Sequence, residues 1–446
     1  MHTRISPSSI VVFFLLLAAV VTPTNVPAQV RWHGVIEIAA GRGDKGPWRQ
    51  NDSAYDYVDD PAVAIHASGD MAVIWIDQQR KDVFFQNISR DGTRQDVPVN
   101  VSRNPATFSW LPRLVVAPED TKRIYILWQE IIFSGGSHGG DILFAYSEDA
   151  GKSFSAPRNL SASMAGDGKG RLNRDVWSNG SLDLAMDGNG ILYVAWTEYE
   201  GKLWFARSTD GGKNFSHPRS ITGGPLQPAR APSLAPGPGQ TVYLAWTVGE
   251  DPAADIRVAR SGDGGNTFGQ PQRVGAGKGH ADAPKLALDP GGTLHVVYAE
   301  SSNGPFGRYH IRHARSADHG KTFGAPQVIS ARPANAPAGA GYPALAIDAQ
   351  GRLFVIWEMF PAPGAAPRGL AFAVSSNGGK TFTAPAMVPG SVDPAGGANG
   401  SQQGLLTKKL AVNAAGAIAA VNSSLKHNER SRVWLMRGEW DRQAIR

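Results

Sequence analysis

The chain has 446 residues, of which 44 are Lys or Arg and 38 are Asp or Glu, giving a formal net charge of +6. Its hydrophobic content of 42%, with 18% charged residues, excludes a disordered chain, and the absence of Cys excludes disulfides, thiolate metal sites and a Cys nucleophile. The 52 Gly and 31 Pro favour many tight turns over long helices.

The N-terminal segment has the pattern of a secretory signal peptide, which we place at residues 1–28. Arg4 supplies a positive charge, Ile10 to Val21 is an uninterrupted apolar run, and Val26-Pro27-Ala28 has the small residues of a cleavage site. The run is short for a membrane span, so an uncleaved anchor is the less favoured alternative. We therefore expect a secreted or periplasmic mature chain without stable membrane insertion.

The mature chain keeps only a small positive surplus. Removing residues 1–28 removes one Arg and no acid, so the net charge becomes 43 − 38 = +5. The chain has no run of five or more basic residues and no basic stripe interleaved with aromatics. Nucleic acid is therefore not an expected partner, whereas weak attraction to an acidic polysaccharide remains open.

Short apolar runs alternate with Gly, Asn and Asp turns along residues 29–446, which is typical of β-strands joined by tight turns. The pattern repeats in units, and the second run of each unit ends near an aromatic residue. The residues at this position are Trp75, Trp128, Trp196, Trp246, Tyr298, Trp357 and, in the seventh copy, Asn422. Units of this size predict an all-β fold in one domain, a β-propeller of four-stranded blades.

We expect seven blades, with six as the alternative if the weakest units at the two ends merge. The seventh unit lacks an evident fourth strand, because the chain ends soon after R-V-W-L-M-R at 432–437. The mature N-terminus begins with R-W-H-G-V-I-E-I, which has a strand pattern. We expect residues 31–39 to complete the last blade and close the ring, since closure removes exposed sheet edges.

The turn after the third run of each unit repeats the pattern S-x-D-x-G-x-x-F, with Asn377 in place of Asp in the last copy. The five copies lie at 147–154, 208–215, 261–268, 316–323 and 375–382, and a degenerate copy lies at 89–93. The Asp carboxylate is expected to accept backbone N–H groups of its own turn, and Gly supplies a positive φ. One carboxylate per turn is too few for calcium, so no metal site is expected.

In these repeated turns the chain resembles the Asp-box, or bacterial neuraminidase repeat, proteins of the sialidase superfamily, over about residues 60–390. The resemblance implies a carbohydrate-active propeller that binds or hydrolyses a glycan or polysaccharide, and no cofactor is expected. The alternative is a non-catalytic scaffold or assembly factor outside the cytoplasm that binds a protein partner. Fold analogy alone does not choose between these functions.

The repeated turns also indicate which end of the ring carries the site. They join the third and fourth strands, so the opposite end carries the connections between the second and third strands and between blades. The longer segments there are 102–111, 162–180, 222–231, 275–283, 331–342 and 390–406. Because function concentrates on loops over a rigid scaffold, we expect the ligand on the axial face away from the repeated turns.

Two groups of residues are predicted to converge on that face. The first precedes the innermost strands and supplies the candidate substrate-binding residues Trp110, Arg113, Arg174, Asp175, Trp177, Arg230 and His280. The second follows the second strands and consists of the acids Asp77, Glu130, Glu198, Glu250, Glu300 and Glu358. The alternative for each of these is structural, because buried polar groups are normally satisfied by neighbouring backbone or side chains.

The resemblance assigns roles to some of these residues. Sialidases bind the substrate carboxylate with three Arg residues, which are implied here to be Arg113, Arg174 and Arg230. They use a Tyr paired with a Glu as nucleophile and an Asp as acid/base. The nucleophile is implied to be Tyr342, with Glu358, Glu300 or Glu198 as its partner.

The implied acid is Asp59, Asp60 or Asp175, and we favour Tyr342, Glu358 and Asp59 as the catalytic set. Trp110, Trp177 and Tyr342 are expected to stack on sugar faces. The chain departs from the family pattern because the Arg-Ile-Pro stretch before the first repeat is missing. The nearest sequence is Leu-Pro-Arg at 111–113, and seven units exceed the six blades typical of these enzymes.

Overall fold

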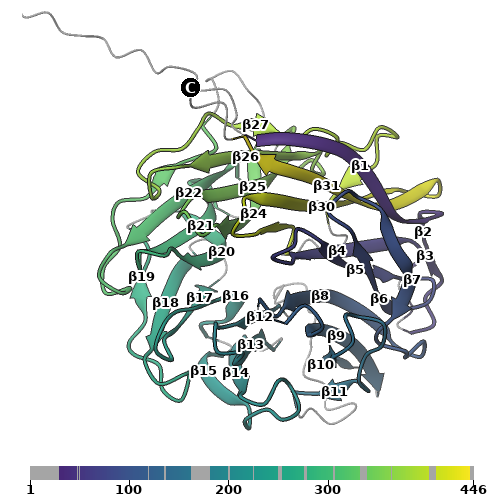
Figure 1. The fold of residues 1–446 in the computed structure, drawn as a ribbon, viewed down its shortest axis with the longest axis horizontal. Helices are drawn as coiled ribbons and strands as arrows, with labels where there is room; N and C mark the ends of the chain where they lie inside the picture. The colour runs from purple at the N-terminus through teal and green to yellow at the C-terminus, as the bar shows by residue number, and fades with distance from the viewer. Residues whose placement is uncertain are drawn as a thin grey trace, which may run out of the picture.

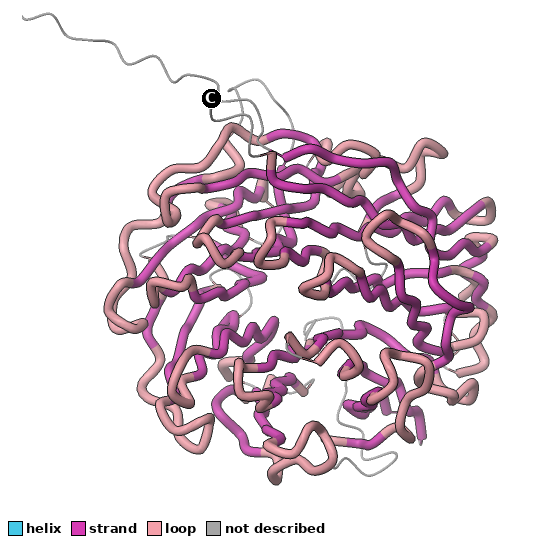
Figure 2. Tube along the Cα trace, in the orientation of Figure 1, coloured by secondary structure: helices cyan, strands magenta, loops and turns pink. Residues whose placement is uncertain are grey.

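The computed structural model describes residues 30–441, except for 48, 50, 119, 135–136, 162–180, 199–200, 225, 250–253, 276–278, 305–306, 332–338, 363 and 401–407. Within that part, the chain forms antiparallel strands and turns without any helix (Figure 2). Hence no described helix could cross a membrane. Seven sheets stand around a central axis, so the protein is a seven-bladed β-propeller and the six-bladed alternative is wrong (Figure 1).

Blades 1 to 3 follow one another in sequence, and each runs from the axis outward in strand order. Their strands are β4 (Val58–Ile65), β5 (Met71–Asp77), β6 (Asp82–Ile88) and β7 (Arg94–Asn100); β8 (Phe108–Val116), β9 (Ile124–Ser134), β10 (Ser137–Ser147) and β11 (Arg158–Asn159); and β12 (Leu182–Met186), β13 (Leu192–Thr197), β14 (Lys202–Ser208) and β15 (Arg219–Gly223). A two-stranded ribbon, β2 (Asp44–Lys45) with β3 (Tyr55–Asp56), precedes blade 1.

Blades 4 to 6 repeat the same up-and-down order. Their strands are β16 (Ala229–Pro236), β17 (Val242–Val248), β18 (Asp255–Ser261) and β19 (Gln272–Arg273); β20 (His280–Leu288), β21 (Leu294–Ser301), β22 (Tyr309–Ser316) and β23 (Gln327–Val328); and β24 (Gly339–Ile347), β25 (Leu353–Phe360), β26 (Leu370–Ser375) and β27 (Ala386–Met387). The outermost strand is only two residues long in each of these blades, which limits exposed edge pairing.

Blade 7 is built from both ends of the chain, as predicted. It contains β29 (Leu410–Val412), β30 (Ala417–Lys426), β31 (Arg430–Trp440) and β1 (Val30–Gly41), and the short β28 (Ala398–Asn399) also pairs with β30. The N-terminal strand β1 pairs along almost the whole of β31, from Val30 opposite Trp440 to Gly41 opposite Ser431 (Figure 1). This pairing closes the ring.

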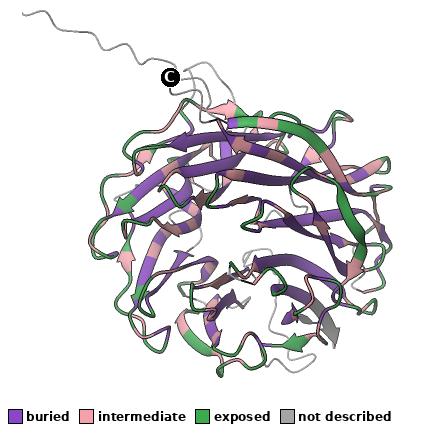
Figure 3. Cartoon of the chain, viewed as in Figure 1, coloured by how far each residue is buried: buried purple, intermediate pink, exposed green. Residues whose placement is uncertain are grey.

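The core lies between neighbouring blades rather than inside any one of them. Buried residues occupy much of the strands around the ring (Figure 3). The aromatic residue near the end of each second strand is buried against the preceding blade, for example Trp246 between blades 3 and 4 and Tyr298 between blades 4 and 5. Burial of one such side chain contributes on the order of 2–3 kcal/mol. In blade 7, where Asn422 holds this position, Trp434 from the next strand fills the interface.

The repeated turns form the hydrogen bonds that their spacing predicted. In the third copy, Ser261 Oγ donates to Asp263 Oδ1 at 2.7 Å, and the same carboxylate accepts the backbone N–H of Thr267 at 2.9 Å. The backbone N–H of Gly265 donates to Ser261 Oγ at 2.8 Å. The other four copies repeat these contacts, with the Asn377 side chain accepting in the last.

The turns also pack against the preceding blade. Gly265 has a φ of +86°, and a Cβ there would lie 2.2 Å from the ring of Phe205 in blade 3. The closing aromatic of the same turn, Phe268, lies edge-on to Phe205 with centroids 5.2 Å apart. The repeat is thus both a local turn and an inter-blade contact, which explains why it needs Gly and an aromatic residue at fixed positions.

Candidate functional site at the loop face

Five inner strands carry the same irregularity at the end of the ring opposite the repeated turns, which we call the loop face. Each has a β-bulge at an X-Pro pair. The residues before Pro have positive φ and are Asp60 (50°), Leu111 (52°), Ala231 (54°), Ala283 (60°) and Tyr342 (49°). Such angles are uncommon outside Gly, and bulges redirect side chains near sites.

Two of these bulges donate a backbone N–H to a polar side chain of the preceding blade. Asp60 Oδ2 accepts the N–H of Leu111 at 3.0 Å, and Ser181 Oγ accepts the N–H of Ala231 at 2.7 Å. Both donors are themselves positive-φ residues, so the bulges at Leu111 and Ala231 are each fixed by a polar side chain of the preceding blade. At these positions the structural alternative raised from the sequence is realised: the polar residue satisfies neighbouring backbone.

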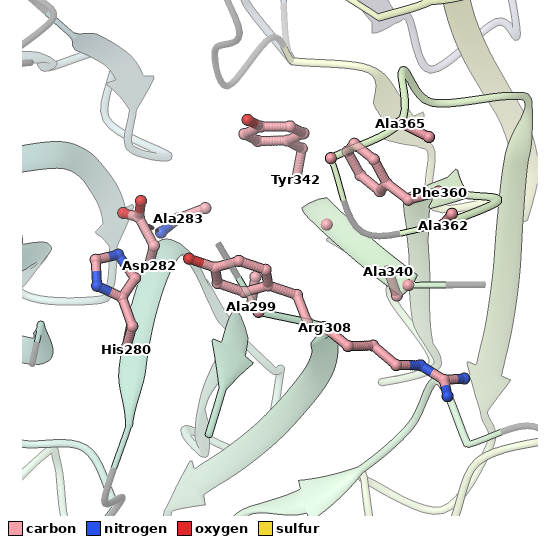
Figure 4. A pocket seen from close by; sticks show the side chains of 15 residues that line it. His280, Asp282, Ala283, Ala299, Arg308, Ala340, Tyr342, Phe360, Ala362 and Ala365 are labelled. Carbon is pink, nitrogen blue, oxygen red and sulfur yellow. Dashed lines mark hydrogen bonds between the residues drawn. The ribbon is translucent and has the colours of Figure 1, made fainter. Parts of the chain in front are cut away.

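A pocket of about 360 Å³ opens on the loop face between blades 5 and 6 (Figure 4). It is bounded by the starts of β20, β22 and β24, the ends of β21 and β25, and the loop after β25. Its polar and aromatic lining residues are His280, Asp282, Arg308, Tyr309, Tyr342 and Phe360. The other lining residues are Gly and Ala, and the volume suits one small ligand group.

One wall of the pocket is organised by Arg230, which extends from β16 in blade 4 to the start of β20. Its Nε lies 3.3 Å from Asp282 Oδ1, and its Nη2 lies 3.2 Å from His280 Nε2. Its Nη1 donates to the carbonyl of Gly249. A guanidinium only donates, so His280 Nε2 is the acceptor in this contact. His280 and Asp282 lie side by side in Figure 4.

Asp282 remains ionised in this arrangement. Burial acts to raise the pKa of its carboxyl group, but the Arg230 guanidinium and hydrogen bonds from Thr247 Oγ1 at 2.9 Å and the Ala283 N–H at 2.8 Å outweigh burial. The net effect is a lowered pKa. A carboxylate bound in this way orients Arg230 and is poorly suited to donate a proton.

Tyr342 lies across the pocket from His280 and Asp282 (Figure 4). Its ring packs against Ala231 and Ala283, and its centroid lies 6.0 Å from that of Phe360. Burial, with the nearby carboxylates of Glu358 and Asp282, raises the pKa of the Tyr342 phenol above its ordinary value. The phenol therefore keeps its proton at neutral pH.

Glu358, the predicted partner of Tyr342, is committed elsewhere. It is 3% exposed and forms a buried ion pair with Lys409, whose Nζ also donates to Asn422 Oδ1 at 3.3 Å. No hydrogen bond between Glu358 and Tyr342 is found among the described residues. Its charge raises the pKa of Tyr342, which is the opposite of activating a phenolate nucleophile.

Two further predicted residues lie inside the ring rather than in the pocket. Asp59 is 2% exposed, and its Oδ1 accepts a hydrogen bond from Ser423 Oγ at 2.7 Å, which links blade 1 to blade 7. Trp110 is 3% exposed and belongs to the core between blades 2 and 3, with its ring 6.0 Å from that of Phe108. Neither side chain is positioned to touch a ligand in the pocket.

Arg113 is also distant from the pocket lining. It is 1% exposed and donates to the carbonyl groups of Leu111 and Pro112, at 3.1 Å each. Of the three predicted arginines, Arg230 alone is brought to the pocket among those described. Arg174, Asp175 and Trp177 lie outside the described residues, as does Glu250.

The described acids that follow other second strands serve local roles. Glu130 accepts hydrogen bonds from Asn104, Thr107 and Trp128, although burial raises its pKa. Glu300 lies 2.8 Å from Arg312 on the adjacent strand. Neither lines the pocket, so the repeated acids stabilise their own blades at these positions.

The sequence analysis did not select Arg308, Tyr309 or Phe360, which all line the pocket. Tyr309 lies edge-on to His280, with centroids 6.1 Å apart, and the side chain of Arg308 extends away from His280 (Figure 4). Tyr309 begins the third strand of blade 5, and Arg308 directly precedes it. A sequence signal for these residues was the polar and aromatic run Arg308-Tyr309-His310, which directly follows a Gly-containing loop between two strands.

No group of three or more His, Asp or Glu side chains in the described part of the chain is arranged to hold a metal ion. The pocket lining thus offers one imidazole, two phenols, one bound carboxylate and the Arg308 guanidinium, and the Arg230 guanidinium contacts two of the lining residues, His280 and Asp282.

Comparison with known proteins supports the fold. No protein-family profile and no curated protein sequence matches the chain. A protein of unknown function from Dyadobacter fermentans matches with a TM-score of 0.54 at 14% identity, over 76% of this chain and 97% of that one. An ulvan lyase of polysaccharide lyase family PL25, bound to -[GlcA(1-4)Rha3S]-, also matches with a TM-score of 0.54, at 13% identity over 90% and 95% of the two chains.

A microbial sialidase, Hz136, matches less closely, with a TM-score of 0.46 at 16% identity over 73% of this chain and 68% of that one. That likeness is too distant to carry any argument. At such low identities, the two closer likenesses establish a shared propeller fold and do not transfer a site or an activity.

Proposed function

We propose that this protein is a carbohydrate-active propeller that binds an acidic polysaccharide in the pocket between blades 5 and 6 and cleaves it by β-elimination. The observation that carries the proposal is that Arg230, from blade 4, contacts His280, from blade 5, at a pocket on the loop face that Tyr342, from blade 6, also lines. Arg230 suits a sugar carboxylate because its planar fork can bind both oxygens.

Hydrolysis by paired carboxylates is less well supported. Glycosidases of that kind place two carboxyl groups about 5–9.5 Å apart across the scissile bond. Among the described lining residues, Asp282 is the single carboxylate, and it is bound by Arg230 and Thr247. A sialidase-like Tyr–Glu pair is disfavoured by the Lys409 ion pair and by the raised pKa of Tyr342.

Elimination uses the groups that the pocket contains. In our proposal the sugar carboxylate binds Arg230, which frees Nε2 of neutral His280 to accept the proton on the carbon next to that carboxylate. The electron pair of the broken C–H bond forms a C=C bond, and the glycosidic C–O bond breaks. Tyr342, which retains its proton, donates it to the leaving oxygen. The products are a new chain end with a hydroxyl group and an unsaturated uronate.

The fold comparison contributes the substrate class. The ulvan lyase with the same fold is described as bound to a glucuronate-containing sugar, and a second lyase, Uly1, matches with a TM-score of 0.52. The proposal extends that class of substrate to this chain on the chemistry of its own pocket. Polysaccharides of this kind are extracellular, which fits the expected export of the chain.

The test is to incubate the purified protein with a panel of uronate-containing polysaccharides and matched neutral polysaccharides. We expect ultraviolet absorbance from an unsaturated uronate and new reducing ends in equal amounts, on acidic substrates alone. Reducing ends without the absorbance would show hydrolysis and contradict the elimination step. Binding without either product would contradict cleavage and leave a glycan-binding protein.

A protein-binding scaffold is the remaining alternative, and no specific observation favours it. The exposed large hydrophobic residues among those described are Val35, Val97, Leu226, Val328, Met387 and Val392. Val35 lies against Gly390, close to Met387 and Val392 in the chain, and the other three belong to other blades. A protein-binding face normally has a larger contiguous apolar patch. A protein inert toward every glycan in binding and cleavage assays would move the function to this class.

A further inference from the structure

A second cavity, of about 260 Å³, lies at the outer part of blade 1, where β6 and β7 meet the repeated turn of blade 2 at 147–154. The polar side chains that line it are those of Gln86, Asn87, Gln95, Asp96 and Lys152, and the apolar ones are those of Phe85, Val97 and Val99. In Figure 1, β6 and β7 lie on the opposite side of the ring from β20 and β22, which border the polysaccharide pocket. The proposed reaction makes no use of this cavity.

The cavity lies beside a bulge in the outer strand β7. The pairing of β6 with β7 is interrupted so that residues 96–98 lie opposite the single residue Gln86. Asp96 takes a positive φ of 61° in this bulge, and its carbonyl accepts a hydrogen bond from Gln86 Nε2 at 3.0 Å. Bulges bend a strand and redirect its side chains, and they recur next to binding sites.

Gln86 brings a buried hydrogen-bond acceptor to the cavity. The residue is 3% exposed and lines the cavity. Its Nε2 is engaged by the Asp96 carbonyl, whereas its Oε1 has no hydrogen-bond partner among the described residues. Buried polar atoms of native proteins are nearly always paired with protein, water or a ligand. One water needs only about 10–15 Å³, so the cavity has room for a larger group that donates to this oxygen.

The rim of the cavity offers both a donor and an acceptor. Lys152 is exposed on the turn of blade 2 and only donates, whereas the exposed carboxylate of Asp96 only accepts. Asn87 Nδ2 donates to the Ala150 carbonyl at 2.8 Å, which holds that turn against blade 1. One acid and one base give the lining a net charge of 1 − 1 = 0. Amide, carboxylate and ammonium groups without net charge suit an uncharged ligand whose groups both donate and accept, as hydroxyl groups do.

We propose that this cavity binds one neutral sugar residue and forms a second glycan-binding site. A hydroxyl group of the sugar donates to Gln86 Oε1, and neighbouring hydroxyl groups bind Asp96 and Lys152. The C–H face of the sugar ring packs against Val97 and Val99. The volume lies below the roughly 300–1,000 Å³ of sites for drug-sized ligands, which fits one sugar residue. The site needs neither a uronate nor cleavage, so it stands or fails independently of the proposed function.

The test is saturation-transfer NMR of the full protein with the methyl glycosides of glucose, galactose, mannose and rhamnose, and with methyl glucuronoside as the charged comparison. We expect saturable binding of at least one neutral glycoside. Lys152→Met and Asp96→Asn should each weaken it about three- to tenfold. Asn tolerates the positive φ of residue 96. Lys321→Met, at the same position of the repeated turn in blade 5, is the matched control and should keep the wild-type affinity.

A third variant addresses the buried acceptor itself. Gln86→Leu removes this oxygen and should weaken binding about tenfold or more. If that variant does not fold, the two variants at exposed positions still test the site. No saturable binding of any neutral glycoside, an affinity unchanged in Lys152→Met and Asp96→Asn, or an equal loss in Lys321→Met would each overturn the proposal. Binding of the glucuronoside alone would also overturn it, because a uronate is the ligand proposed for the other pocket.

Discussion

The repeated turns form one end of the ring, which we call the turn face, and the loop face is the other end. The two faces are formed by opposite ends of the same strands, yet they are built differently. On the turn face, five copies of one sequence pattern form the same hydrogen bonds, and every donor and acceptor within a copy lies within four residues. On the loop face, Arg230 and His280 meet across fifty residues of sequence. The first face is encoded locally and serves the fold, whereas the second is assembled from three blades and carries the proposed chemistry.

The comparison predicts that loop-face changes affect activity and turn-face changes affect stability. The largest expected effect is on turnover of the acidic polysaccharide by Tyr342→Phe. Loss of the proton donor should reduce the rate about 10²–10⁴-fold, with the free energy of unfolding almost unchanged. Tyr146→Phe, which removes a hydroxyl next to a repeated turn, is the matched control and should retain full activity. An active Tyr342→Phe would remove this residue from the mechanism.

The inter-blade core should show the largest effect on stability. Trp246→Ala removes a fully buried ring between blades 3 and 4 and should lower the free energy of unfolding by about 3–5 kcal/mol, measured by chemical denaturation. Leu226→Ala, at a side chain that is 97% exposed, should change it by less than about 0.5 kcal/mol. Equal effects from the two variants would contradict the placement of the core between blades.

The Gly residues of the repeated turns allow a sharper test of the turn face. Gly265 and Gly378 both have positive φ, but a Cβ on Gly265 would meet the ring of Phe205, whereas one on Gly378 meets nothing within 4 Å. Gly265→Ala should therefore lose about 1–3 kcal/mol more stability than Gly378→Ala. If the two variants lose the same amount, the contact with the preceding blade is unimportant and the turn acts by local conformation alone.

One turn-face position departs from the repeat and should make stability depend on pH. His313 lies against Gly379 where Phe205 lies against Gly265, and its Nε2 is 3.0 Å from Nδ1 of His295, whose Nε2 is 3.2 Å from Asp289. Burial, followed by the charges of His295 and Arg315, lowers the pKa of His313 to about 3. Below the ordinary His value of about 6.5, the unfolded chain thus binds more protons than the folded one.

The free energy of unfolding should therefore fall as the pH is lowered from about 6.5 toward about 3, and rise in the opposite direction. His313→Phe places there a ring like those of Phe85, Phe144 and Phe205, which lie against the corresponding Gly residues, and should make that dependence shallower. Denaturation curves at several pH values between about 4 and 7 provide the measurement. A slope identical to that of the wild type would show that the buried His pair does not control acid stability.

The sequence predicted the fold well because the information is local. Alternating apolar runs, the aromatic residue of each second strand and the repeated turn each occur within one unit, and seven similar units determine the ring. Closure by β1 also followed from local evidence, since the last unit lacked a strand and the mature N-terminus had a strand pattern. The signal peptide and export stay predictions.

The site was predicted less completely, for two physical reasons. The X-Pro bulges interrupt the two-residue alternation of side chains along the inner strands. The sheet face to which the Trp110 and Arg113 side chains point therefore could not be deduced from spacing, and both side chains are buried in the ring. The buried pairing of Glu358 with Lys409 joins residues 51 positions apart, which no local pattern reveals. Tyr342, Arg230 and His280 lie on the loop face, where the sequence placed them, and their roles in binding or catalysis stay predictions.

The most direct test of the central claim is the structure of the protein with an acidic oligosaccharide bound. The account predicts the sugar on the loop face between blades 5 and 6, with its carboxylate on Arg230 and the carbon next to that carboxylate facing His280. An acidic sugar bound on the turn face, or over the opposite blades with Arg230 still held by Asp282 and His280, would contradict the account.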